Sequence, residues 1–95
     1  MVVVSSNQNY GNHYWGIYQP IMRALNELLI TYANENIKTR IKANLLCPRA
    51  VDTSFRDKIM PGENKNSLLS TKAVAKKILK ITSESFQETG KIIDI

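Results

Sequence analysis

Few residues of this sequence have the type and spacing that a catalytic or metal site needs. Cys47 is the only cysteine, so no disulfide can form within the chain and no C-x-x-C metal motif is present. Its thiol could serve as a nucleophile, but a small residue at the end of a predicted strand is more typical of a buried core position. Ser5 and Ser6 follow a run of valines, where a hydroxyl commonly caps a turn. We predict no metal site and no cysteine chemistry.

The glycine pattern excludes the common phosphate-binding loops from this sequence. A G-x-G-x-x-G turn or a Walker-type loop needs several glycines within a few residues, because the backbone must approach a phosphate closely. The four glycines are instead far apart, at Gly11, Gly16, Gly62 and Gly90. We therefore expect these 95 residues to bind no nucleotide cofactor by themselves.

The charge balance gives no clear partner. A net charge of +5 comes from 13 Lys and Arg against 8 Asp and Glu, which could indicate nucleic acid or an anionic membrane. The basic residues alternate through residues 38–42 or lie along a predicted helix at 72–80, so we interpret them as solvated faces. We expect no nucleic-acid partner because these basic faces are solvated. We expect no membrane partner because no apolar run approaches the roughly 20 residues that span a bilayer. The first four residues lack the basic flank of a signal peptide, and a cytoplasmic protein is expected.

The elements that must position any site begin with a strand and a long helix. Residues 1–4 are a β-branched run typical of a buried strand. Apolar residues recur every three or four positions from residue 14 to 36, which predicts a helix. Pro20 fits that helix only in or near its first turn. The predicted apolar stripe contains Tyr18, Met22, Leu25, Leu29 and Tyr32, widened by Ile21, Leu28 and Ala33.

The second half of the chain continues the alternation of strands and helices. Apolar and polar residues alternate over residues 40–46, which predicts a strand. Residues 52–60 suggest a short helix, and residues 61–64 predict a turn. Ser70 is a plausible N-cap for a helix that ends at Ile81, and residues 91–95 form a last strand. The order β-α-β-α-α-β predicts an α/β fold with a partial Rossmann-like, doubly wound parallel sheet. The apolar face of the later helix is predicted to be Val74, Ile78, Leu79 and Ile81.

Four segments, in this order, resemble the C-terminal half of the short-chain dehydrogenases/reductases over nearly the whole chain. Residues 3–6 are similar to the strand that ends in the family's active-site serine, and residues 14–25 are similar to its Tyr-x-x-x-Lys helix. Residues 41–53 look like a strand followed by a Pro-Gly-x-Val-x-Thr turn, and residues 89–95 look like the final strand. The resemblance implies an NAD(P)-dependent oxidoreductase whose N-terminal, cofactor-binding half is not included in this sequence.

The resemblance assigns the catalytic roles to Tyr18 and Ser6, and Ser5 is the poorer of the two serine candidates. In the family, the tyrosine protonates the developing alkoxide, the serine orients the substrate oxygen, and a lysine one helical turn later lowers the tyrosine pKa and binds the nicotinamide ribose. Met22 occupies that lysine position, and a thioether carries no charge and donates no hydrogen bond. Arg23 is rotated about 100° further around the helix, so we do not expect it to replace the lysine. Tyr18 and Ser6 are therefore expected to be vestigial.

The cofactor-contacting turn is also altered. The resemblance places Pro48, Val51 and Thr53 in that turn, with Val51 and Thr53 facing the nicotinamide carboxamide and the pyrophosphate. Arg49 stands where the family has glycine, and its side chain would obstruct the close approach of a nicotinamide. The intact family uses NAD or NADP, and we expect these positions to be vestigial here.

We predict a single truncated domain, residues 1–95, that is a remnant or fragment of a short-chain oxidoreductase and is inactive alone. The alternative is a non-catalytic interaction subunit that pairs through residues 14–36 with itself or with a full-length paralogue, because the long helix of the family contributes to its dimer interface. An incomplete sheet should also expose apolar surface along residues 2–4 and the long helix.

Overall fold

The computed structural model describes residues 1–6 and 15–95. Within them, three parallel strands form one sheet in the order β1-β2-β3. The predicted α/β class, the parallel sheet and the element order are confirmed, and a short 3-10 helix is added to that order. The elements are β1 (Val2–Val4), α1 (Tyr18–Glu35), β2 (Asn44–Cys47), α2 (Ser54–Ile59), η1 (Lys65–Ser67), α3 (Thr71–Ile81) and β3 (Ile92–Asp94).

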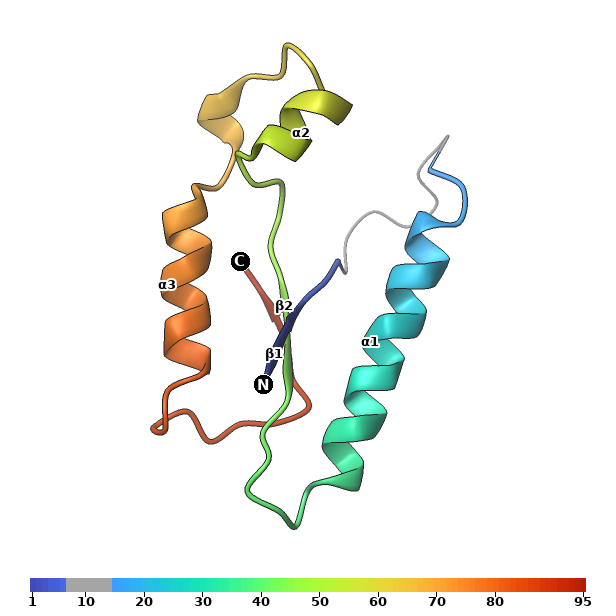
Figure 1. The fold of residues 1–95 in the computed structure, drawn as a ribbon, viewed down its shortest axis with the longest axis vertical. Helices are drawn as coiled ribbons and strands as arrows, with labels where there is room; N and C mark the ends of the chain where they lie inside the picture. Colours follow the sequence, from blue (N-terminus) through green and yellow to red (C-terminus); the bar gives the residue numbers. More distant parts are fainter. Residues whose placement is uncertain (7–14) are drawn as a thin grey trace.

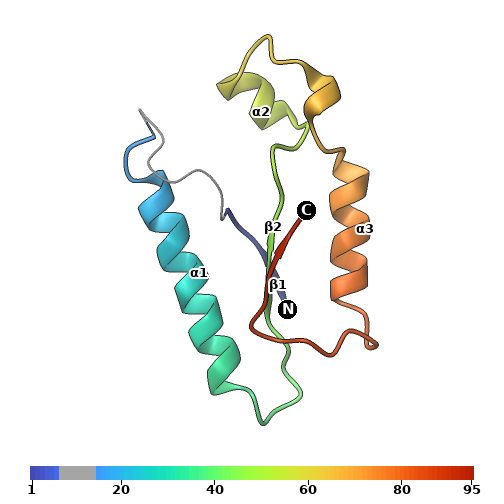
Figure 2. The same ribbon diagram turned by 180° about the vertical axis from the view of Figure 1, so that it is seen from behind.

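The two long helices cover opposite faces of the sheet. Figure 1 shows the strands between α1 on one side and α3 on the other, and Figure 2 shows the same layers from behind. The chain crosses the sheet in one direction, from β1 to β2 to β3, while its connecting helices lie on different faces. The two crossovers therefore have opposite hands, although most connections between parallel strands are right-handed.

Helix α1 begins at Tyr18, later than the start predicted at residue 14. Tyr14 lies outside the described residues. Gly16 has a positive φ of 55°, a left-handed conformation that an α-helix does not contain, so it forces the helix to begin after it. Pro20 lies in the first turn, where its missing N–H removes no helical hydrogen bond. The prediction that Pro20 is tolerated only near the helix start is confirmed.

Strand β2 is shorter than predicted and is buried throughout. It covers Asn44–Cys47, and all four of its residues are buried instead of alternating between core and solvent. The alternation predicted over residues 40–46 is wrong because helices cover both faces of the sheet. Ala43 is outside the strand, since its N–H donates to the Thr89 hydroxyl at 3.0 Å and not to a neighbouring strand.

The main hydrophobic core lies between α1 and the sheet. The members from α1 share one face of the helix. The other members are alternate residues, two within β2 and one just before it. Val3 and Ile30 pack against this cluster. The cluster contains Leu29, Ala33, Ala43, Leu45 and Cys47. Cys47 is completely buried in this core, as expected of a small core residue.

The opposite face of the sheet is organised by one buried amide. The Asn44 side chain donates to the Glu88 carbonyl at 2.9 Å and accepts from the Lys91 N–H at 3.1 Å. These bonds hold the segment before β3 against β2, because a buried amide is satisfied only with both partners in place.

Helix α3 begins as predicted, but its buried face differs from the prediction. The Ser70 hydroxyl accepts a hydrogen bond from the Ala73 N–H at 3.1 Å and caps the helix. Ile81 is buried, whereas Leu79 is 71% exposed, so the inclusion of Leu79 in the apolar face is wrong. Leu79 lies next to Ile78 and Lys80, and consecutive helical residues cannot share one narrow face.

Candidate functional site at the carboxyl edge of the sheet

The predicted site residues lie at one edge of the sheet. Parallel strands end at a common edge, so Ser5 and Ser6 after β1 and the 48–53 turn after β2 are near neighbours. Figure 1 shows that α1 also begins at this edge, which brings Tyr18 to the same end of the molecule. In open α/β sheets, ligands bind at the carboxyl ends of the strands.

A buried hydrogen-bond network ties the end of β1 to α1. The Ser5 N–H donates to the Leu46 carbonyl at 2.9 Å, and the Ser5 hydroxyl donates to the Asn26 side-chain oxygen. The Asn26 amide in turn donates to the Ser6 carbonyl at 3.0 Å. Ser5 and Asn26 are both buried. The Ser5 hydroxyl is thus committed to a structural bond, whereas Ser6 is half-buried at the more accessible position.

Tyr18 lies at the start of α1 with 44% of its surface exposed. Its ring meets Trp15 in an edge-to-face contact, with the ring centroids 5.3 Å apart, and its N–H donates to the Trp15 carbonyl. Over residues 1–6 and 15–95, no hydrogen bond joins the Tyr18 hydroxyl to Ser6. The structure therefore brings these residues to one edge without linking them directly, and their catalytic roles stay predictions.

The face of α1 that packs on the sheet near this edge is polar. Met22 and Arg23 are both half-buried, and Gln19 and Asn26 are buried. The side-chain oxygen of Gln19 has no hydrogen-bond partner, which is uncommon for a buried polar atom. The sequence interpretation missed Gln19 and Asn26, although their spacing of seven residues, with Ala33 seven further on, is the signal of a common helix face.

Electrostatics at the end of β2 do not activate Cys47. Burial raises the pKa of the Cys47 thiol, the nearby carboxylate of Asp94 raises it further, and the positive charge of Arg23 opposes both effects. A raised pKa keeps the thiol protonated and unreactive. The positive charge of Arg23 lowers the pKa of Cys47, so the Arg23 charge acts toward the end of β2.

The turn after β2 is held by backbone bonds and a helix cap. Pro48 is half-buried, and the N–H of the exposed Arg49 donates to the Ile95 carbonyl at 3.1 Å. Val51 forms an isolated parallel bridge with Leu69. The Thr53 hydroxyl accepts from the Arg56 N–H at 3.1 Å and caps α2. Thr53 thus has a structural partner whether or not it faces a pyrophosphate.

The segment beyond this turn is fastened by an ion pair. The Arg56 guanidinium donates two hydrogen bonds to the Glu63 carboxylate, at 2.8 and 3.0 Å. This bidentate contact holds the pKa of Glu63 below its usual value of 4.5 and raises the pKa of Arg56. The pair connects α2 to the turn that follows it.

Two kinds of site are not found in the described part of the chain. No group of three or more His, Cys, Asp or Glu side chains there is arranged to hold a metal ion. None of the helices described is both long and apolar enough to cross a membrane.

Comparison with solved structures identifies the fold. A short-chain dehydrogenase from Salmonella enterica serovar Typhi superposes with a TM-score of 0.85 and 24% identity, over 98% of this chain and 39% of that chain. The Escherichia coli oxidoreductase yciK gives 0.83 and 24%, over 98% and 38%. The angucycline C-6 ketoreductase LanV, solved with bound NADP, gives 0.77 and 19%, over 98% and 40%.

Sequence comparisons add nothing to this result, since neither the protein-family models nor the curated protein sequences contain a match. The chain spans about 40% of the length of the solved structures that it matches. The predicted resemblance is confirmed by three structures at the level of architecture. The chain therefore has the fold of part of a short-chain dehydrogenase, with the partial Rossmann-like sheet that its sequence predicts.

Proposed function

We propose that this chain is part of a short-chain oxidoreductase and that its own site is catalytically silent. The observation that carries the proposal is Met22, which lies one helical turn after Tyr18 at the edge where the strands end. A proton donor for carbonyl reduction needs a group that stabilises its deprotonated form. A half-buried thioether has no charge and no donor to do so.

The cofactor side of the site supports the same proposal. A nicotinamide dinucleotide needs hydrogen-bond donors for its ribose and a close backbone approach for its phosphates. Met22 offers no such donor, and Arg49 places a long side chain in the turn. The Thr53 hydroxyl accepts from the Arg56 N–H and keeps its own O–H to donate, so the misfit lies at Met22 and Arg49. These residues do not fit the cofactor, so we derive no reaction step through it.

A turnover assay tests this proposal. Purified chain is incubated with NADH or NADPH and a panel of aldehydes and ketones, and oxidation of the cofactor is followed by its absorbance. We expect no rate above that of buffer. A protein-dependent rate with any carbonyl, if it disappears in Tyr18→Phe, would refute the proposal because it would require a working proton donor.

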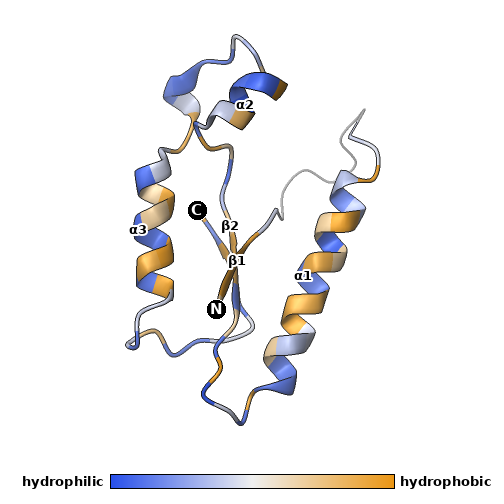
Figure 3. Cartoon of the chain, viewed as in Figure 1, coloured by the Kyte–Doolittle hydropathy of each residue, from blue (hydrophilic) through white to orange (hydrophobic). Residues whose placement is uncertain are grey.

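We propose as a second function that the chain is an interaction subunit, because α1 exposes apolar side chains that its own sheet does not cover. Figure 3 shows hydrophobic residues along most of the length of α1. Ile21 is 55% exposed and Leu28 is 68% exposed, and both tyrosines of the helix are also exposed. The exposed stripe is Tyr18, Ile21, Leu28 and Tyr32, at spacings of three, seven and four residues that keep them near one side of the helix. Such a stripe is typical of a helix that packs on a partner.

Oligomeric state and partner capture test this second function. We expect the chain to self-associate or to bind a full-length short-chain dehydrogenase, and we expect Ile21→Asp to weaken the association. Phe55→Asp, at a residue of α2 that is 71% exposed, is the matched control and should have no effect. A monomer that ignores a full-length dehydrogenase would count against the proposal.

A further inference from the structure

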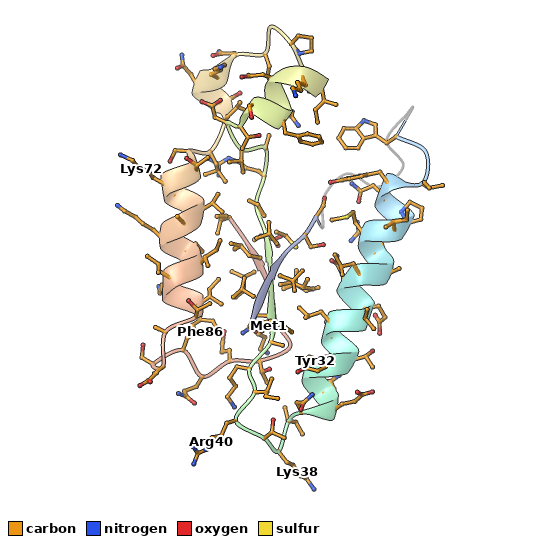
Figure 4. All side chains as sticks on the ribbon, in the orientation of Figure 1. Met1, Tyr32, Lys38, Arg40, Lys72 and Phe86 are labelled. Atoms are coloured by element: carbon orange, nitrogen blue, oxygen red, sulfur yellow. The ribbon has the colours of Figure 1, made fainter. Side chains whose placement is uncertain are left out.

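The outer face of α3 carries a row of positively charged side chains. Lys72, Lys76 and Lys80 are exposed and follow one another at intervals of four residues. This interval keeps them on one side of the helix, about 6 Å apart along its axis. Figure 4 shows Lys72 pointing outward from α3, away from the sheet. We call these three residues the lysine row.

No carboxylate of the described chain pairs with the lysine row. Residues 64–83 contain five lysines and no Asp or Glu. Within residues 1–6 and 15–95, the ion pairs are formed by Arg56 and Lys65, and none includes a residue of α3. The row is therefore a patch of one charge sign on the surface of the molecule.

The lysine row does not stabilise the helix that carries it. Like charges four residues apart repel each other on a helix, so Lys76 is unfavourable to both Lys72 and Lys80. Lys72 also lies in the first turn, where the helix dipole disfavours a cation, and that turn contains no acidic residue. Solvation does not require a single charge sign, because alternating lysines and glutamates at this spacing would be soluble and would stabilise the helix. A partner explains the row better than the helix itself does.

An exposed leucine lies beside the row. Leu79 is 71% exposed. It lies three residues after Lys76 and next to Lys80, so it projects from the same side of α3. A protein partner can cover such a side chain with an apolar residue, whereas a phosphate backbone cannot. Helix α3 also has no aromatic side chain on which a nucleic-acid base could stack. The combination favours a protein partner over a nucleic acid.

We propose that the outer face of α3 is a docking surface for an acidic helix of a partner protein. Carboxylates at intervals of four residues on that helix have the same repeat as the lysine row, and an apolar residue among them covers Leu79. A second copy of this face does not fit, because it would bring lysines against lysines. The surface lies on the opposite side of the sheet from α1. The inference therefore goes beyond the interaction function proposed above and can fail independently of it.

A pair of designed peptides tests the inference on the full 95-residue chain. The acidic probe is an alanine-based helix of about 20 residues, with glutamate at every fourth position and a leucine beside the central glutamate. The control probe has glutamine in place of each glutamate. Binding is followed by the fluorescence anisotropy of a dye on the peptide at low ionic strength, where charges are least screened. We expect the acidic probe to bind roughly tenfold more tightly than the control probe, and added salt to weaken its binding.

Charge reversal within the row gives a matched comparison. Lys76→Glu should weaken binding of the acidic probe by roughly tenfold or more, because it sets a carboxylate against those of the probe. The variant should stay folded, as checked by circular dichroism, since a glutamate between two lysines adds favourable pairs to the helix. Lys38→Glu changes the net charge equally at an exposed residue that Figure 4 shows far from α3, and it should bind like the parent. Leu79→Gln keeps every lysine and should weaken binding by a smaller factor.

Equal binding of the two peptides, or equal losses in Lys76→Glu and Lys38→Glu, would overturn the inference, because either result would show that the row does not recognise carboxylates. A single-stranded oligothymidylate is the competing probe. If it binds more tightly than the acidic peptide and Leu79→Gln does not affect it, the surface fits a nucleic acid and the named partner is wrong. Ile21→Asp, which tests the stripe on α1, should leave peptide binding unchanged, so the two interaction proposals are separated by their variants.

Discussion

Asn26 is the residue that joins the end of β1 to the helix beside it. Its amide oxygen accepts from the Ser5 hydroxyl, and its amide nitrogen donates to the Ser6 carbonyl. The predicted stripe of α1 left out Asn26 because an amide usually lies at the surface. Burial of an amide costs little free energy, however, when its oxygen and its nitrogen both form hydrogen bonds. Polarity alone therefore does not identify the exposed face of a helix. The serines could be predicted from the sequence, whereas their partner could not.

Removal of this amide should destabilise the chain. We expect Asn26→Leu to lower the free energy of unfolding by about 1–3 kcal/mol, because it leaves the buried Ser5 hydroxyl and the part-buried Ser6 carbonyl without this partner. Urea unfolding measures the change. The double variant with Ser5→Ala should lose less than the sum of the single variants, since it removes both members of one hydrogen bond. Additive losses would show that the pair is not coupled.

The Arg56–Glu63 pair should make stability depend on acid pH. The pKa of Glu63 is lowered in the folded chain by its hydrogen bonds to Arg56, so its contribution to stability is present above the usual value of 4.5 and is lost as pH falls through the folded value. Urea midpoints measured from roughly pH 3 to pH 7 should fall less steeply on the acid side in Glu63→Gln than in the parent. Glu84→Gln, at an exposed residue that forms no ion pair within residues 1–6 and 15–95, is the control. Identical pH profiles for Glu63→Gln and the parent would contradict this role.

At the scale of elements, type and order are easier to predict than boundaries. The period of α1 and the cap of α3 predicted both helices, because those signals lie within each segment. The start of α1 depends on Gly16 and the extent of β2 on the Thr89 hydroxyl. Thr89 is distant in sequence from the strand that it limits, so no local pattern contains that information. Of the apolar stripe predicted for α1, Leu29 and Ala33 are buried, whereas Ile21 and Leu28 are exposed.

The packing face of α1 can be tested with two adjacent leucines. Leu29 is 6% exposed in the core and Leu28 is 68% exposed. We expect Leu29→Ala to lower the free energy of unfolding by about 2–5 kcal/mol, enough to unfold a small domain, because it leaves a cavity against β2. Leu28→Ala should change it by no more than about 0.5 kcal/mol. Comparable losses measured by thermal unfolding would place both leucines in the core and contradict the described orientation of α1.

At the scale of the whole molecule, the chain has an α/β fold with one well-packed layer and uncovered apolar surface. The predicted exposure along residues 2–4 and the long helix is found at Val4 and along the outer side of α1. The core between α1 and the sheet is small, and small cores supply little stability. The exposed apolar side chains of α1 are the basis of the proposed interaction function.

Cofactor binding tests the central claim most directly. Titration calorimetry with NADH and NADPH is performed on the parent chain and on Met22→Lys, with circular dichroism to confirm that both are folded. We predict no saturable binding to either protein, because one restored cation cannot supply the glycine-rich turn that holds the phosphates. Saturable binding to the parent chain would contradict the claim, since it would mean that these residues assemble a nicotinamide site without the lysine and the glycine turn.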